Sequence, residues 1–148
     1  MTTVVFDTVF FIRLVLSRFR GVRQQLFRLW RDHHFEVALS EPILAEIRDV
    51  LLRDELVLKH GLAKNEVEDL VAAFSSFASL VEPAEVSEPI LAERDPNDLP
   101  ILGTALAAAA DFIVTEDNDL LSLNQYHGIS ILTPGNFHAI LEQGEETA

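Results

Sequence analysis

Four acidic residues stand where a parallel sheet would bring their side chains together: Asp7, Glu46, Asp98 and Asp117. Asp7 ends the apolar run 4–6, and Asp117 follows the apolar run 112–115. Glu46 and Asp98 each fall on the inward-facing stripe of a predicted helix, where a lone carboxylate is out of place. Carboxylates gathered in one cleft repel one another and need a counter-charge, usually a hard divalent cation. Such cations commonly act on phosphodiesters, so the grouping favours a nuclease.

Short apolar strands alternating with helices would position these acids. We predict strands at 3–6, 35–39, 112–115 and 129–132, and helices at 8–19, 22–32, 40–53, 64–79, 98–110 and 134–141. Ser40 is the predicted N-cap of its helix, and the Pro- and Glu-rich residues 82–97 are predicted to form a surface loop. The alternation predicts an α/β fold, a three-layer α/β/α sandwich with a central parallel sheet. Ligands bind such sheets beyond the carboxyl ends of the strands.

Each acid also has an ordinary structural explanation. Glu46 would fit at the boundary of the core, paired with an arginine. Asp7 and Asp98 stand where helix N-caps are expected. Asp117 and Asp119 lie two residues apart and both could reach the pocket, but Asp119 is more typical of a cap and Asp117 of a ligand. We favour the metal site because four acids are placed independently at one end of one architecture.

Two threonines adjoin the strand-end acids. The hydroxyls of Thr8 and Thr115 can position a water molecule or an amide, and the preference of threonine for strands is the alternative explanation. Other chemistries lack the residues that they need. The chain has no cysteine, which excludes thiolate chemistry, and its five histidines show no zinc-ligand spacing.

The length of 148 residues predicts one domain, at residues 1–141, followed by an acidic tail at 142–148 that is polar and frayed. No apolar run approaches the ~18 residues needed to span a bilayer. The first apolar stretch also lacks the basic leader of a signal peptide. We therefore expect a cytoplasmic protein with no membrane partner.

Four stretches of the sequence resemble a known family. They are VVFDT (4–8), LSEPILAEIRDVL (39–51), RDPNDLPILGTALAAAADFIVTEDNDLL (94–121) and ISILTPGNF (129–137). Together they resemble the PIN domain, specifically the VapC-like toxins of bacterial and archaeal toxin–antitoxin pairs. The resemblance implies an α/β/α fold and a Mg²⁺- or Mn²⁺-dependent ribonuclease site. It implies that the metal-binding acids are Asp7, Glu46, Asp98 and Asp117, with Asp119 as an auxiliary candidate.

The resemblance also implies an activity and its partners. The activity is metal-assisted endoribonuclease hydrolysis of RNA phosphodiester bonds, and the partners are a small antitoxin protein and a second copy of the chain. Val9 stands where the family's first motif usually has Asn, which predicts reduced turnover. The alternative function is a PIN-fold protein-interaction module with weakened catalysis. A phosphoacceptor receiver domain is disfavoured, because it needs a lysine near the late strands and the last lysine is Lys64.

The charge distribution bears on RNA binding. The formal net charge is −13, which opposes a broad nucleic-acid surface. Positive charge is concentrated in the first 31 residues, which hold six arginines and one acid. The candidate RNA-binding residues are Arg13, Arg18, Arg20 and Arg23, and a solvated arginine face or a subunit contact is the alternative.

Overall fold

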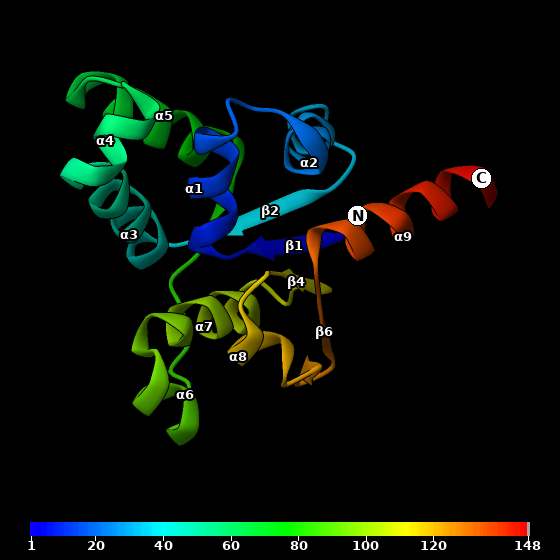
Figure 1. Cartoon of the computed structure of the whole chain (residues 1–148). Helices are drawn as coiled ribbons and strands as arrows, with labels where there is room; N and C mark the ends of the chain where they lie inside the picture. The colour runs from blue at the N-terminus through cyan, green and yellow to red at the C-terminus, as the bar shows by residue number, and fades with distance from the viewer. Residues whose placement is uncertain (148) are drawn as a thin grey trace.

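A six-stranded sheet runs through the centre of the computed structural model, which describes residues 1–147 (Figure 1). Its strands are β1 (Thr3–Phe6), β2 (Glu36–Leu39), β3 (Ser79–Leu80), β4 (Phe112–Val114), β5 (Gln125–Tyr126) and β6 (Ile129–Leu132). The order across the sheet is β3-β2-β1-β4-β6-β5. All neighbours are parallel except β5, which runs antiparallel to β6. The predicted α/β architecture is confirmed, with one antiparallel edge strand added.

Helices cover both faces of the sheet. They are α1 (Thr8–Leu16), α2 (Gly21–Arg31), α3 (Glu41–Leu51), α4 (Asp54–His60), α5 (Lys64–Phe77), α6 (Pro89–Arg94), the 3-10 turn η1 (Pro96–Asp98), α7 (Leu99–Ala107), α8 (Asn118–Leu121) and α9 (Pro134–Thr147). Figure 1 shows α1, α2 and α5 on one side of the sheet, and α6, α7 and α8 on the other. Helices α3 and α4 lie beside α1, toward the end to which β1 and β2 point.

The chain reverses its winding direction between β1 and β4. From β1 it crosses to β2 on one side, and it later returns to form β4 on the other side of β1. The two strands pair in register, with Phe6 opposite Val114, and Asp7 N–H donates to the Val114 carbonyl at 3.3 Å. Open α/β sheets bind ligands at such a reversal, beyond the carboxyl ends of the strands. The fold therefore places the ends of β1 and β4 at the expected site.

Aromatic side chains fill the core between the sheet and α1, α2 and α5. Phe6 stacks on Phe10 with a centroid separation of 3.9 Å, and Phe11 contacts both Trp30 and Phe74. All five rings are buried. Phe77, the last residue of α5, is 44% exposed. Burial on this scale anchors β1 and α1, which carry Asp7 between them.

Several element boundaries differ from the prediction. The helix after Ser40 ends at Leu51, and a separate helix, α4, follows until Gly61 ends it in a left-handed conformation (φ 70°). Ser40 makes no capping hydrogen bond; its Oγ lies 2.7 Å from Thr104 Oγ1 and ties the start of α3 to α7. The expected surface loop at 82–97 contains α6 and the beginning of η1.

The C-terminal helix is longer than predicted. We expected it to end near Leu141, but α9 continues to Thr147. The acidic tail expected at 142–148 stays a prediction, and its last residue, Ala148, lies outside the described residues. In residues 1–147 no helix has both the length and the apolar character needed to cross a membrane.

Candidate metal centre

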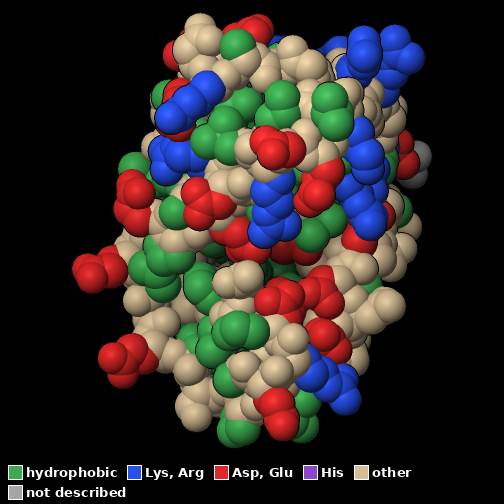
Figure 2. Space-filling model, turned by 60° about the vertical axis from the view of Figure 1, so that its left-hand side comes forward, with side chains coloured by type: hydrophobic (Ala, Val, Ile, Leu, Met, Phe, Trp, Pro, Cys, Tyr) green, Lys and Arg blue, Asp and Glu red, His purple; other side chains and the backbone are tan. Residues whose placement is uncertain are grey.

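A small acidic pocket opens at the carboxyl edge of the sheet. It is lined by Asp7, Thr8, Val9, Glu46, Asp95, Asn97, Asp98, Ile101 and Asp117. Its volume is about 50 Å³, far below the size of typical small-molecule sites. Figure 2 shows acidic side chains gathered around a hollow on this face, with most of the visible Lys and Arg side chains above it. A cation with its water fits such a volume, and any larger ligand must lie across the mouth.

Three carboxylates form the tightest group in the pocket, which we call the acid triad. Asp95, Asp98 and Asp117 each offer an oxygen, and these atoms lie within 4.8 Å of one another. Asp95 and Asp98 come from the turn between α6 and α7, and Asp117 comes from the end of β4. Like charges at this separation repel strongly in a partly buried site, so the triad requires either protons or a cation.

Asp98 is the most deeply buried member of the triad. Its side chain is 6% exposed, and its Oδ2 atom is buried without a hydrogen-bond partner in residues 1–147. Burial, followed by hydrogen bonding and repulsion from Asp117, raises the pKa of Asp98 to about 8. Without a cation the environment therefore favours the protonated carboxyl, and an ionised Asp98 lacks a ligand for one oxygen.

Asp7 is held from two sides at the end of β1. Its Oδ1 accepts a hydrogen bond from Phe10 N–H at 3.0 Å, and its Oδ2 accepts one from Thr115 Oγ1 at 2.5 Å. Asp7 is thus the N-cap of α1 as well as a wall of the pocket. Burial raises its pKa to about 6, although both hydrogen bonds oppose that change. The alternative explanation of Asp7 as a cap is correct, and the two roles coexist.

Glu46 faces Asp7 across the pocket from α3. Its Oε2 accepts a hydrogen bond from Thr8 Oγ1 at 3.0 Å. Burial raises the pKa of Glu46, and the Thr8 hydrogen bond opposes the increase. The charge of Arg53 also opposes the increase, so the alternative of a boundary glutamate near an arginine stays a prediction. Thr8 and Thr115 together orient two of the pocket carboxylates.

The comparison with known families agrees with this geometry. A family model described as the PIN domain matches residues 3–119. The chain belongs to the PIN-domain family. The matched region includes every residue that lines the pocket. No curated protein matches the chain at a significant level.

The oxygen donors of this PIN domain fit a hard divalent cation. The pocket contains five carboxylates and no histidine, and Mg²⁺ and Mn²⁺ prefer carboxylate and water oxygens. The unpartnered Oδ2 of Asp98 is a donor atom without any other described role. A bound cation would offset the repulsion within the triad and allow Asp98 to ionise. The residues present therefore fit the metal that the family implies.

The acids predicted from the sequence occupy the pocket with one addition and one exception. Asp7, Glu46, Asp98 and Asp117 all line it, and so does Asp95, which the sequence did not single out as a metal ligand. Asp95 does cap η1 through Asn97 N–H at 3.1 Å, so its spacing three residues before Asp98 was the available signal. The exception is Asp119.

Asp119 lies outside the pocket lining. Its Oδ1 accepts a hydrogen bond from Arg94 at 3.2 Å, which links α8 to α6. The expectation that Asp119 caps the following helix is wrong. Asp117 is the N-cap of α8, because its Oδ1 accepts from Asp119 N–H at 2.8 Å. A metal-binding role of Asp119 stays a prediction.

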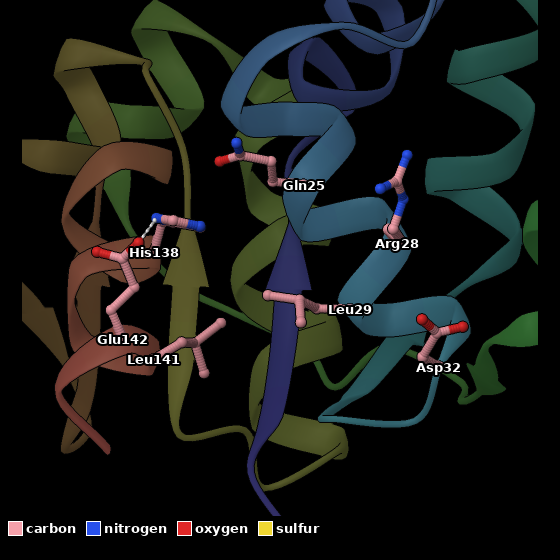
Figure 3. Close-up of a pocket in the computed structure, with 7 residues that line it drawn as sticks. All are labelled: Gln25, Arg28, Leu29, Asp32, His138, Leu141 and Glu142. Atoms are coloured by element: carbon pink, nitrogen blue, oxygen red, sulfur yellow. Dashed lines mark ion pairs between the residues drawn. The ribbon is translucent and has the colours of Figure 1, made fainter. Parts of the chain in front are cut away.

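A larger hollow lies elsewhere in this PIN domain, between α2 and α9 (Figure 3). Its volume is about 250 Å³, and its lining mixes charges of both signs with Leu29 and Leu141. His138 Nδ1 lies 3.6 Å from Glu142 Oε1 within it. Among the described residues, Asp32, His138 and Glu142 of this hollow do not form a group that could hold a metal ion.

Proposed function

We propose that this PIN domain is a divalent-metal-dependent endoribonuclease that hydrolyses RNA phosphodiester bonds. The observation that carries the proposal is Asp98, whose buried Oδ2 lacks a partner while two further carboxylates of the triad lie within 4.8 Å. Carboxylates this close together repel one another unless one of them holds a proton or a cation is bound. Family membership supports nuclease chemistry, and the small volume of the pocket suits a polymer that binds across its mouth.

The pocket residues would divide the work between metal binding and positioning. Asp7, Asp98 and Asp117, with Asp95 and Glu46 around them, would hold Mg²⁺ or Mn²⁺. The bound ion supplies a water of lowered pKa and stabilises the charge on the leaving oxygen. Thr115 fixes the orientation of Asp7, and Thr8 fixes that of Glu46, so both carboxylates are held in place before a ligand arrives. No side chain in the pocket needs to act as a covalent nucleophile.

A cleavage assay with labelled single-stranded RNA tests this proposal. We expect no cleavage in EDTA, cleavage after addition of Mg²⁺ or Mn²⁺, and a loss of at least about 100-fold in Asp98→Asn. Asp69→Asn is the matched control, because Asp69 is exposed on α5 outside the pocket lining. Cleavage by Asp98→Asn at the wild-type rate would show that the pocket takes no part in the reaction.

We further propose a cellular role as the toxin of a toxin–antitoxin pair, acting in the cytoplasm as a homodimer and neutralised by a small antitoxin. The support is the resemblance of residues 4–8, 39–51 and 94–121 to VapC-like toxins. Induced expression in a bacterial host should arrest growth, and Asp98→Asn should relieve the arrest at equal protein level. Equal growth of cells expressing either protein would contradict the toxin role.

A second candidate function rests on Val9. This residue lines the pocket and is 40% exposed, where the family's first motif usually carries Asn. A branched apolar side chain cannot donate or accept a hydrogen bond at the pocket mouth, which favours a protein-interaction module with weakened catalysis. Val9→Asn separates the two functions. We expect it to raise the cleavage rate above that of the wild type if the site is catalytic, whereas an inactive protein in both forms would support the interaction module.

A further inference from the structure

Two arginines from different helices converge on one carboxylate oxygen beside the pocket. Arg13 Nη1 on α1 donates to Glu116 Oε2 at 2.8 Å, and Arg23 Nη2 on α2 donates to the same oxygen. Burial would raise the pKa of Glu116, but Arg23 and then Arg13 outweigh it and hold that pKa below its usual range. Glu116 is therefore ionised and fixes both guanidinium groups. We call these three residues the arginine clamp.

The clamp retains positive charge and free donors. Two guanidinium groups against one carboxylate leave a net charge of about +1 in a protein whose overall charge is −13. Only one nitrogen of each arginine contacts Glu116, so other guanidinium N–H groups are left for a further anion; the buried Arg23 Nε, which has no acceptor in residues 1–147, is not among the accessible ones. The Arg13 side chain is half exposed at 51%. The clamp can therefore bind a further anion without releasing Glu116.

The clamp lies next to the acid triad along two chain segments. Glu116 directly precedes Asp117, a triad member. Arg13 lies four residues after Val9 on α1, so both occupy the same helix face about 6 Å apart. Repulsion from Glu116 also contributes to the raised pKa of Asp7, which indicates that the clamp and the pocket are electrostatically close. An extended anion that reached the triad would meet the clamp one helix turn away.

We propose that Arg13 and Arg23, ordered by Glu116, bind the RNA phosphate adjacent to the one that is cleaved. This inference rests on the proposed ribonuclease function. A guanidinium presents a planar fork of donors that matches phosphate oxygens, and phosphates recur at every nucleotide of the strand. The clamp also offsets the effect of the protein's net negative charge on RNA binding, because it supplies local attraction beside carboxylates that would otherwise repel RNA. Of the four predicted RNA-binding arginines, the geometry selects two; Arg18 and Arg20 are exposed in the turn between α1 and α2.

The test is binding of fluorescein-labelled single-stranded RNA, of about 20 nucleotides, measured by anisotropy in EDTA. Salt is varied from about 50 to about 300 mM for the wild type, Arg13→Gln and Arg23→Gln. Arg31→Gln is the matched control, because it removes the same charge from α2 about 12 Å farther along the helix axis. Arg13 is half exposed, so Arg13→Gln tests the clamp even if Arg23→Gln fails to fold.

We expect each clamp variant to bind RNA about tenfold more weakly at low salt, and the slope of log affinity against log salt to fall by about 0.7 per arginine. Arg31→Gln should change affinity less than twofold. Equal behaviour of all three variants, or no RNA binding by the wild type, would overturn the proposal. So would arginine-dependent binding of a labelled oligoglutamate peptide in place of RNA, which would indicate a carboxylate partner.

Cleavage assays with Mn²⁺ separate this proposal from the ribonuclease proposal. RNA binding that depends on the clamp, without any cleavage, would support the clamp proposal and contradict the ribonuclease proposal. Cleavage with an unchanged KM in both clamp variants would support the ribonuclease proposal and contradict the clamp proposal. If both proposals hold, KM should rise about tenfold in the clamp variants while kcat changes less.

Discussion

The hydroxyl of Thr115 donates to Asp7 Oδ2 at 2.5 Å and joins the ends of β1 and β4 across the point where the sheet reverses. Thr115 Oγ1 in turn accepts a hydrogen bond from Asp117 N–H at 2.9 Å. One buried side chain thus positions two pocket acids from neighbouring strands. The candidate metal centre is built into the sheet edge, so its geometry depends on the fold and not on a flexible loop alone.

Removal of the Thr115 hydroxyl should weaken both the fold and the site. Thr115→Val keeps the side-chain volume but leaves Asp7 Oδ2 and Asp117 N–H without their partner in a buried position. We expect a loss of about 1–3 kcal/mol in the free energy of unfolding and weaker Mn²⁺ binding. Urea unfolding and a metal titration measure the two effects. Thr115→Ser is the control and should retain both, whereas wild-type behaviour of Thr115→Val would contradict the role.

The metal-free protein should lose stability as the pH rises. The pKa values of Asp7 and Asp98, about 6 and about 8, lie above the ordinary value of 3.8. Between these limits the folded state holds protons that the unfolded chain has released, so the stabilisation is complete below about pH 4 and declines through pH 6 and 8. The slope approaches about 1.4 kcal/mol per pH unit for each linked group.

Urea unfolding in EDTA at a series of pH values checks whether the stability of the metal-free protein falls as the pH rises. Asp98→Asn carries a neutral amide, so it should remove the upper part of the decline, between about pH 6 and pH 8. Asp69→Asn should leave the decline unchanged. Stability that increased with pH over this range in the wild type would show that Asp98 is already ionised in the metal-free protein.

Gly103 should tolerate no side chain. A Cβ atom at this position of α7 would lie 2.4 Å from the Ala84 carbonyl oxygen and 3.2 Å from Pro83 Cβ. The Ala84 N–H also donates to the Gly103 carbonyl at 3.0 Å, so the segment before α6 is bound closely to the helix. We expect Gly103→Ala to cost about 1–3 kcal/mol in urea unfolding.

Gly135→Ala provides the comparison for Gly103→Ala. Nothing lies within 4 Å of a Cβ at Gly135, in the first turn of α9, so this change should be neutral or slightly stabilising. A similar effect of both substitutions would show that the segment at Ala84 can move away from α7.

The sequence predicts the parts of the site that lie at the ends of buried strands or on the inward-facing stripe of a helix. The strands that carry Asp7 and Asp117 are short, apolar and β-branched, and Glu46 lies on a clear inward stripe, so their convergence could be predicted. Asp95 was missed because capping η1 explains it locally, while its approach to Asp117 depends on the tertiary position of α6. Asp117 likewise combines capping of α8 with membership of the triad. Local and tertiary roles overlap here, and spacing alone cannot separate them.

The helices and strands that were not predicted from the sequence contain few buried residues, so they show little hydrophobic pattern. Helix α4 has no buried residue, so its sequence shows no stripe; its local signals are the acids of its first turn, the basic residues of its last turn and the cap at Gly61. Strand β3 is two exposed residues at the sheet edge. Pro89 was taken as a sign of a loop, but it occupies the first turn of α6, where proline is well tolerated. These segments are ordered by neighbouring elements, so local patterns predict them poorly.

The most direct test of the metal centre is thermal unfolding of EDTA-stripped protein with Mn²⁺ increased from micromolar to about 10 mM, with Asp98→Asn measured in parallel. A cation at 100 times its Kd adds about 2.7 kcal/mol of stability, which raises the Tm by several degrees in a domain of this size. We predict a saturable rise for the wild type and for Asp69→Asn that is lost in Asp98→Asn. An unchanged wild-type Tm, or an equal rise in Asp98→Asn, would contradict a metal site built on the acid triad.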